Sequence, residues 1–365
     1  MTQLRSRLLL VAILCLITLT SCSRSFVAHG PVPLAVDEAR VDQDLYMQWL
    51  GTSSWIISRG GDVIVVDPFF SRPSARTVAS SLLFPWITKS FGYDVKRIND
   101  VLPALPSDTK AVLVGHAHYD HVMDVAYYMK QKTTPPNVRY IGGVTARSVL
   151  ESFRPVHFTF VEARDAIPIA IPNARVRVIP FNSDHAPHFL GITFLGGHLA
   201  SPPSSFPTTA AEYPTGETEM YLIDFLDSAG AIQWRVFINS AASTPGRAQA
   251  MEAHLSSLPV ELRQPPDVAI LCVPGWDKVA DYPESLLRVL KPQRVVLSHY
   301  DDFFSPYKNG EDPSAGMRFV MFANYDGFIQ RLQQLKSIYG FEFRAPKTGQ
   351  CLRFPEPPGG LPCER

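Results

Sequence analysis

The feature that most constrains this chain is a dense group of metal-capable side chains just after an apolar run. Residues 111–114 are apolar and predict a short buried strand, and the group follows as His116, His118, Asp120 and His121. Side chains two residues apart on an extended segment point to the same side, so the first two histidines can bind one ion. The other pair lies at a strand-to-helix turn and can face a second ion. Such ligands suit zinc, and also iron or manganese; the alternative is a polar turn with incidental histidines.

The pattern His-x-His-x-Asp-His after an apolar strand resembles the signature of the metallo-β-lactamase-fold hydrolases. The resemblance extends over about residues 45–345. It implies an α/β fold, an αββα sandwich, with the metal site at one edge between the two sheets. Residues 346–365 then form a C-terminal tail rich in proline and glycine.

Two more histidines follow strands in the order that the resemblance requires. His185 comes after the alternating pattern at 175–181, and His299 comes after the strand predicted at 294–298. His188 is the rival to His185 as a ligand, or else it lines the substrate pocket. The resemblance implies that His116, His118 and His185 hold one ion, and that Asp120, His121 and His299 hold a second.

Residues at other strand ends bear on these ligands. Asp67 ends the strand at 63–66, and the resemblance implies that it supports the metal-motif loop by fixing a ligand's orientation; the alternative is that it caps a turn. Ser240 stands where binuclear members of the family place an aspartate that bridges the two ions. A neutral hydroxyl is a poor substitute for that charge, so we expect a looser second ion unless Asp184 or Asp224 compensates.

The N-terminus has the pattern of an export signal. Arg5 and Arg7 precede an apolar run at 8–19 that is short for a transmembrane helix. Cys22 after Leu-Thr-Ser resembles a bacterial lipobox, which implies cleavage before it and attachment of lipid. We therefore expect a signal peptide at 1–22, a tether at 23–44, and a membrane-anchored protein of the cell envelope, facing the periplasm from the outer membrane if the cell is Gram-negative. The alternative is an ordinary signal or an uncleaved anchor with a chance cysteine.

The composition gives no electrostatic reason to expect a nucleic-acid partner. The formal net charge is +0, and no basic arm interleaved with aromatics is present. Cys272 lies in an apolar run and indicates a buried thiol. Cys351 and Cys363 flank the tail and are candidates for a disulfide in an oxidising compartment.

The segments between the predicted strands differ in how regular their hydrophobic pattern is. Residues 71–106 contain aromatics and prolines without a clean period, which indicates a loop that shapes a substrate pocket near the mouth of the site, or ordinary packing. Helical spacing covers 122–132 after the motif, and a long helix is predicted over 317–335. Alternation of strands and helices is typical of a layered α/β fold.

Together these patterns predict metal-assisted hydrolysis. Three histidines that leave a coordination position for water lower the pKa of that water towards about 7. If the second ion is absent, Asp120 orients the water or acts as general base. Lactone, ester, amide and phosphodiester bonds are all open to such chemistry. The Trp49 to Ser54 stretch and the strand-terminal His299 resemble the branch with N-acyl-phosphatidylethanolamine phospholipase D and ascorbate-6-phosphate lactonase, which favours a small-molecule or lipid substrate with an ester, lactone or phosphodiester bond. The alternative is a surface lipoprotein that binds metal but is catalytically weak, and that acts as a binding or assembly module.

Overall fold

The computed structural model describes residues 43–84, 91–155, 158–187, 195–306, 319–320 and 323–355. The predicted signal with Cys22, most of the tether, His188 and Cys363 lie outside these ranges. Within them, no helix has both the length and the apolar character needed to cross a bilayer.

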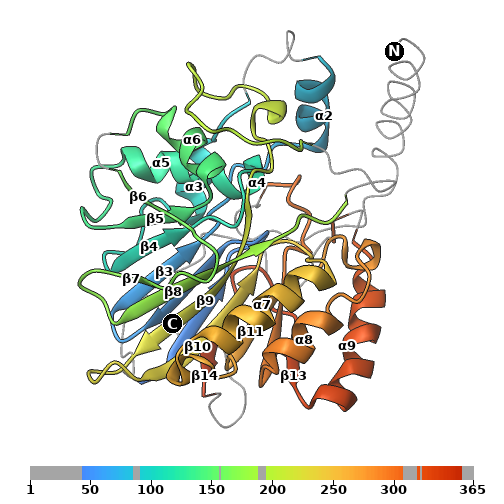
Figure 1. Ribbon diagram of the computed structural model, residues 1–365. Coiled ribbons are helices and arrows are strands. Elements are labelled where there is room, and N and C mark those ends of the chain that lie inside the picture. Colours follow the sequence, from blue (N-terminus) through green and yellow to red (C-terminus); the bar gives the residue numbers. More distant parts are fainter. Residues whose placement is uncertain are drawn as a thin grey trace.

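Two seven-stranded sheets lie face to face and helices cover their outer surfaces, which is the predicted αββα sandwich of the metallo-β-lactamase type (Figure 1). In spatial order, the first sheet consists of β14 (Cys351–Phe354), β1 (Leu45–Trp49), β2 (Trp55–Arg59), β3 (Asp62–Val66), β4 (Thr109–Leu113), β5 (Arg139–Gly142) and β6 (Thr159–Glu162). The second consists of β13 (Glu342–Arg344), β12 (Arg294–Ser298), β11 (Val268–Cys272), β10 (Ile232–Asn239), β9 (Thr218–Leu226), β8 (Val176–Ser183) and β7 (Ile169–Ala170).

The helices divide between the two outer surfaces (Figure 1). On the side of the first sheet lie α2 (Ala75–Leu83), α3 (Val95–Val101), α4 (Tyr119–Val122), α5 (Val125–Lys130) and α6 (Val144–Glu151). The second sheet is covered by α7 (Pro245–Ser257), α8 (Glu284–Leu290) and α9 (Tyr325–Tyr339). Three short 3₁₀ turns occupy Ala210–Glu212, Val260–Leu262 and Trp276–Lys278.

The strands follow from the hydrophobic pattern. Strand β11 is apolar and buried throughout because it lies between parallel neighbours, with one face on the other sheet and one under helices. The hairpin between β2 and β3 turns at Gly60 and Gly61, whose φ angles of 52° and 83° favour glycine. One apolar core fills the space between the sheets and under the C-terminal helices, and a second lies under the N-terminal helices.

Some predicted elements differ in the structure. The stretch at 71–106 contains the helices α2 and α3, whose N-cap residues are Ser74 and Asp94. The side chain of each N-cap accepts a hydrogen bond from a backbone N–H 3.1 Å away. These helices are too short to give a clear period. The helix predicted over 122–132 is two short helices, α4 and α5, and the helix predicted over 317–335 begins later, at Tyr325 after the Asn324 cap.

The folded domain also extends beyond the predicted boundary at residue 345. Instead of belonging to a separate tail, residues 351–354 form β14, which pairs antiparallel with β1 and closes an edge of the first sheet. Cys351 is disulfide-bonded, and its expected partner, Cys363, lies outside the described ranges. Cys272 is a buried free thiol, as predicted.

Candidate metal centre

The predicted ligands gather at one edge of the sandwich because each follows the end of a strand. Strand β4 leads into His116 and His118, β8 into His185, and β12 into His299. Asp120 and His121 lie in α4, which starts directly after His118. Strands β8 and β12 run in the same direction within the second sheet, with three strands between them, and the residues that follow them meet those after β4 of the first sheet at one edge of the sandwich.

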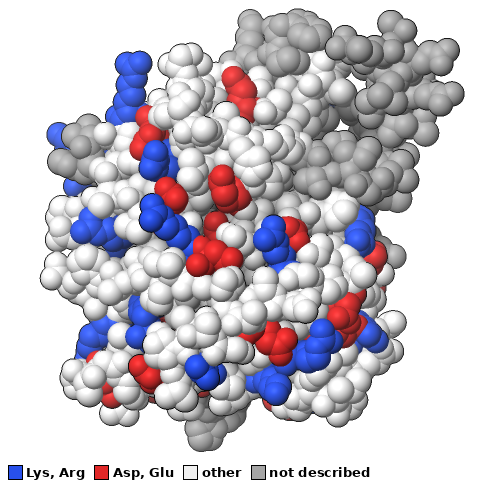
Figure 2. Space-filling model, viewed as in Figure 1, with Lys and Arg blue, Asp and Glu red and all other residues white. Residues whose placement is uncertain are grey.

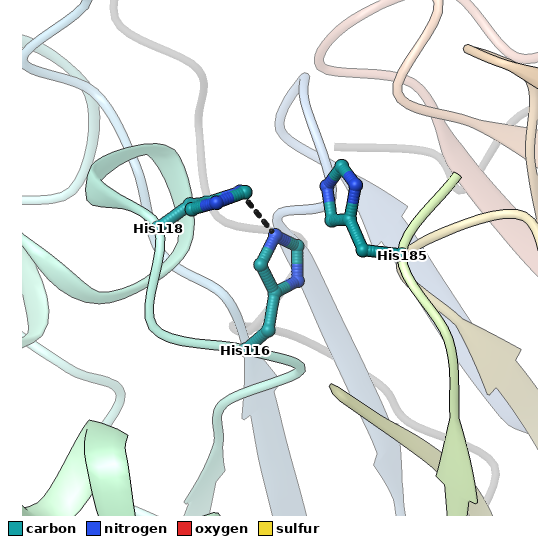
Figure 3. A group of neighbouring side chains, drawn as sticks. All are labelled: His116, His118 and His185. Atoms are coloured by element: carbon teal, nitrogen blue, oxygen red, sulfur yellow. Dashed lines mark hydrogen bonds between the residues drawn. The ribbon is translucent and has the colours of Figure 1, made fainter. Parts of the chain in front are cut away.

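His116, His118 and His185 form the first group, and their rings turn toward one another (Figure 3). The ring centroids are 4.7 to 4.8 Å apart, and one ligand atom from each lies within 4.8 Å of the others. The Nε2 atom of His116 is 3.0 Å from Nδ1 of His118. Two ring nitrogens at that separation need a proton or a cation between them, so this group fits a metal ion.

Hydrogen bonds on the outer side of the first group set the tautomers of two rings. The Thr215 hydroxyl donates to the carbonyl of Leu195 at 3.1 Å, so it accepts from Nε2–H of His118, 2.8 Å away. Nδ1 of His185 lies 2.8 Å from the carbonyl of Ala186, which can only accept. His118 Nδ1 and His185 Nε2 are therefore the unprotonated nitrogens, and their lone pairs are available to a metal ion.

Asp120, His121 and His299 form the second group, and all three are buried. Asp120 Oδ2 lies 3.3 Å from Nε2 of His299 and 3.6 Å from Nε2 of His121. The two groups are neighbours, since the rings of His116 and His121 are 3.8 Å apart between centroids. The edge thus offers two adjacent sets of three ligands.

Charge and burial set the protonation of these ligands. Burial holds the pKa of His116 well below its ordinary value, and the neighbouring histidines, His121 first, lower it further. Burial also disfavours a charged His121, but the carboxylates of Asp67 and Asp120 outweigh it and raise its pKa. Burial would raise the pKa of Asp120, whereas His121 and His299 hold it well below its usual range. A neutral His116 and an ionised Asp120 are the forms that metal ligands need.

Asp67 lies in the supporting position that the resemblance implied. Its carboxylate accepts from the backbone N–H of Gly115 at 2.7 Å, from Nδ1 of His121 at 2.8 Å and from the Ser240 hydroxyl at 2.7 Å. This contact fixes Nδ1 of His121 as the donor and directs Nε2 into the second group. Gly115 is required here, because a Cβ atom would lie 2.5 Å from the Ser240 hydroxyl oxygen.

No bridging carboxylate takes the place of Ser240 in the described part of the chain. Asp184 is held by Thr244 at 2.5 Å and by Arg247 at 2.8 Å. Asp224 is fully buried in ion pairs with Arg177 and Arg235. The compensation considered for these two aspartates is therefore wrong, since both carboxylates are held by arginines and neither is in a metal-capable group.

Other supporting residues carried no signal in the sequence. Thr215 orients His118 from 97 residues away. Asp124 is fully buried and accepts hydrogen bonds from the backbone N–H groups of Phe70 and Ser71, at 2.6 and 2.8 Å, and from the Ser71 hydroxyl. It thereby holds the loop that carries Asp67. These contacts join segments that are far apart in the sequence, so no local sequence pattern could have revealed them.

Comparisons with known proteins bear on the fold of the chain. The family model described as Metallo-beta-lactamase superfamily matches residues 47–202. No curated protein matches the chain.

Three similar solved structures illustrate the range of proteins with a related architecture. Igni18, a metallo hydrolase from Ignicoccus hospitalis, is 18% identical over 85% of this chain and 98% of its own, with a TM-score of 0.49. The isothiocyanate hydrolase from Delia radicum gut bacteria is 11% identical over 84% and 98%, with a TM-score of 0.47. CmlA, a diiron β-hydroxylase from Streptomyces venezuelae, is 14% identical over 87% and 55%, with a TM-score of 0.48. Similarity at this level transfers neither a substrate nor a reaction. The family match and the two-sheet sandwich together identify the fold as that of the metallo-β-lactamases.

Proposed function

We propose that the chain is a metal-dependent hydrolase that uses zinc-activated water on an ester, lactone or phosphodiester-type substrate. One observation carries the proposal: six ligand side chains meet at one edge in two adjacent groups of three. In both groups, hydrogen bonds on the outer side direct ring nitrogens inward. Three protein ligands around an ion leave a position for water or substrate, which is the arrangement of catalytic rather than structural zinc.

Each residue then has a defined role. His116, His118 and His185 would hold the ion, which would lower the pKa of its bound water towards about 7 and so provide hydroxide at neutral pH. If the second group holds no ion, the Asp120 carboxylate accepts a proton from water or orients it, and His121 or His299 donates a hydrogen bond to the developing oxyanion. If the second group holds an ion, these three residues are its ligands.

The surroundings of the second group support a substrate with an apolar portion. The ring of Phe303 lies edge-on to His299 with centroids 5.1 Å apart, and the ring of Phe304 lies beside that of Phe303, tilted by 34°, with centroids 4.4 Å apart. Both phenylalanines are only partly buried. This favours a small-molecule or lipid substrate of the kind implied by the phospholipase D and lactonase branch.

We also propose that the protein is tethered to the cell envelope through a lipid on Cys22, with its body facing the periplasm from the outer membrane if the cell is Gram-negative. The sequence of the first 22 residues supports this placement. Basic and acidic side chains are interspersed on the face shown in Figure 2, which gives no support to a nucleic-acid partner.

The test uses soluble protein that begins after Cys22. Metal content per chain is measured by elemental mass spectrometry, beside turnover of bis-p-nitrophenyl phosphate and a panel of lactones and esters. We expect bound zinc and a measurable rate, both lost in His116→Ala. The matched control is His254→Ala, because His254, in helix α7, is a partly exposed histidine that pairs with Asp165 and belongs to neither ligand group. Absence of bound metal after reconstitution would overturn the proposal.

Ser240 favours a second candidate, a surface lipoprotein that binds metal and serves as a binding or assembly module. Its hydroxyl contacts Asp67 and supplies no charge between the two groups. This candidate predicts tight metal binding in the parent protein without turnover on any member of the panel.

A further inference from the structure

The backbone carbonyl of Thr52 is the meeting point of three hydrogen bonds behind the second group. It accepts from the backbone N–H of His299 at 2.8 Å, from the Ser298 hydroxyl at 3.0 Å and from the indole N–H of Trp49 at 2.9 Å. Thr52 and His299 both have left-handed backbone angles, with φ of 50° and 66°. Residues without a glycine's freedom hold such angles only where surrounding contacts enforce them.

The backbone N–H of the same residue, Thr52, is held by Asp301. Its carboxylate accepts from the backbone N–H of Thr52 at 2.7 Å and forms an ion pair with the Arg72 guanidinium. Both side chains of the pair are fully buried. A buried ion pair contributes little net stability compared with apolar packing, so a role in fixing one arrangement of the chain explains it better.

Arg72 belongs to the loop that also supports the other histidine of the second group. This loop runs from Asp67, which orients His121, to Arg72, which holds Asp301. Its middle is fixed by the Asp124 carboxylate through Phe70 and Ser71. One segment, residues 67–72, therefore contacts His121 directly and is linked to His299 through Asp301 and Thr52.

We propose that the Arg72–Asp301 ion pair is a positioning device, which holds His299 through the backbone of Thr52 and so preforms the second group where no bridging carboxylate is present. Arg72, Asp301 and Thr52 are positioning residues and do not contact the ion. The inference rests on the proposed function, because it assigns the second group a metal ion.

The experiment measures Zn²⁺ affinity in competition with a chromophoric chelator, beside the thermal stability of the metal-free proteins. The variant is Asp301→Asn, and the reference is His299→Ala, which removes the ligand itself. The matched control is Asp224→Asn, which breaks an equally buried ion pair, with Arg235, remote from the metal centre. The two aspartate variants are expected to lose similar stability.

We expect Asp301→Asn to weaken the second Zn²⁺ binding step by about 10- to 100-fold, as His299→Ala does, and to leave the first step unchanged. Asp224→Asn should leave both steps unchanged. If Asp301→Asn does not fold, the same Zn²⁺ titration of Trp49→Phe tests the inference. This variant removes one hydrogen-bond donor to the Thr52 carbonyl and keeps an aromatic ring against Tyr300. It should weaken the same step to a smaller extent.

Each other outcome is also decisive. Equal Zn²⁺ affinity in Asp301→Asn and Asp224→Asn, or no effect of Trp49→Phe when it is the deciding variant, would overturn the inference and leave the proposed hydrolase standing. The same holds if the parent binds a single Zn²⁺ that His299→Ala leaves unaffected. A parent that binds no Zn²⁺ would overturn the proposed function and this inference together.

Discussion

The two ligand groups contain the same number of side chains, but the chain supports them differently. In the first group, the hydrogen bonds that set the tautomers come from Thr215 and from the carbonyl next to His185 itself. In the second group, His121 and His299 are held by buried charges, Asp67 on one side and the Arg72–Asp301 pair on the other. The comparison indicates that rigid support can replace a bridging charge: where Ser240 supplies none, the surrounding loops fix the ligands instead.

The strongest way to break this comparison is to remove the carboxylate of the second group. We expect Asp120→Asn to lower kcat by about 10²- to 10⁴-fold, because Asp120 is either a proton acceptor or a metal ligand. Asp165→Asn, on a surface carboxylate that pairs with His254, is the control and should keep full activity.

Metal content of the same variant then separates the two roles of Asp120. About two ions in the parent and fewer in Asp120→Asn would make the centre binuclear. About one ion in both would make Asp120 the base of a mononuclear centre. Unchanged kcat in the variant would contradict both.

The pH dependence of stability tests the support beneath the second group. Burial raises the pKa of Asp124 to about 6 in the folded protein, above its ordinary 3.8. A carboxyl with a raised pKa binds its proton more tightly in the folded state, so its contribution to the free energy of unfolding is lost as pH rises from about 4 to about 6. Asp124→Asn does not suffer this loss.

The difference in the free energy of unfolding, variant minus parent, should therefore grow by up to about 3 kcal/mol across that window. Urea titrations of the metal-free proteins at several pH values measure it. A difference that is constant with pH would mean that Asp124 titrates at its ordinary pKa.

Asp67→Asn tests the orientation of His121. We expect the second Zn²⁺ step to weaken by about 10- to 100-fold while the first is retained, because an amide cannot hold the Nδ1 proton as strongly as a carboxylate. The Zn²⁺ titration used for Asp301→Asn measures both steps. If Asp67→Asn instead weakened only the first Zn²⁺ step, Asp67 would support the first group rather than His121 of the second group.

The smallest expected effect is at the first group. Thr215→Val removes the hydroxyl that fixes His118 while keeping the shape of the side chain, and should weaken the first Zn²⁺ step by about tenfold, the lower end for such supporting contacts. Thr215→Ser retains the hydroxyl and should behave like the parent. If the valine variant instead weakened the second step, the two groups would not be independent.

The contrast between predicted and missed residues has a physical cause. The six candidate ligands could be found because they lie shortly after the ends of predicted strands, and the ends of these strands lie at the same edge of the sandwich. Asp301 and Arg72 lie among ordinary loop residues, and the role proposed for them depends on a contact between residues 229 positions apart in the sequence. The short helices α2 and α3 and the four-residue strand β14 were missed because so few turns or alternations give no readable period.

The long reach of the Thr52 contacts has a consequence for biosynthesis. A chain made from its N-terminus has all three ligands of the first group once residue 185 has emerged. The hydrogen bond from Thr52 to Asp301, however, cannot form until Asp301 has been synthesised, 249 positions later. Since contacts of such separation form late, the second group should become competent for metal only when nearly the whole domain has folded. Acquisition of the second ion would then act as a check that synthesis and folding are complete.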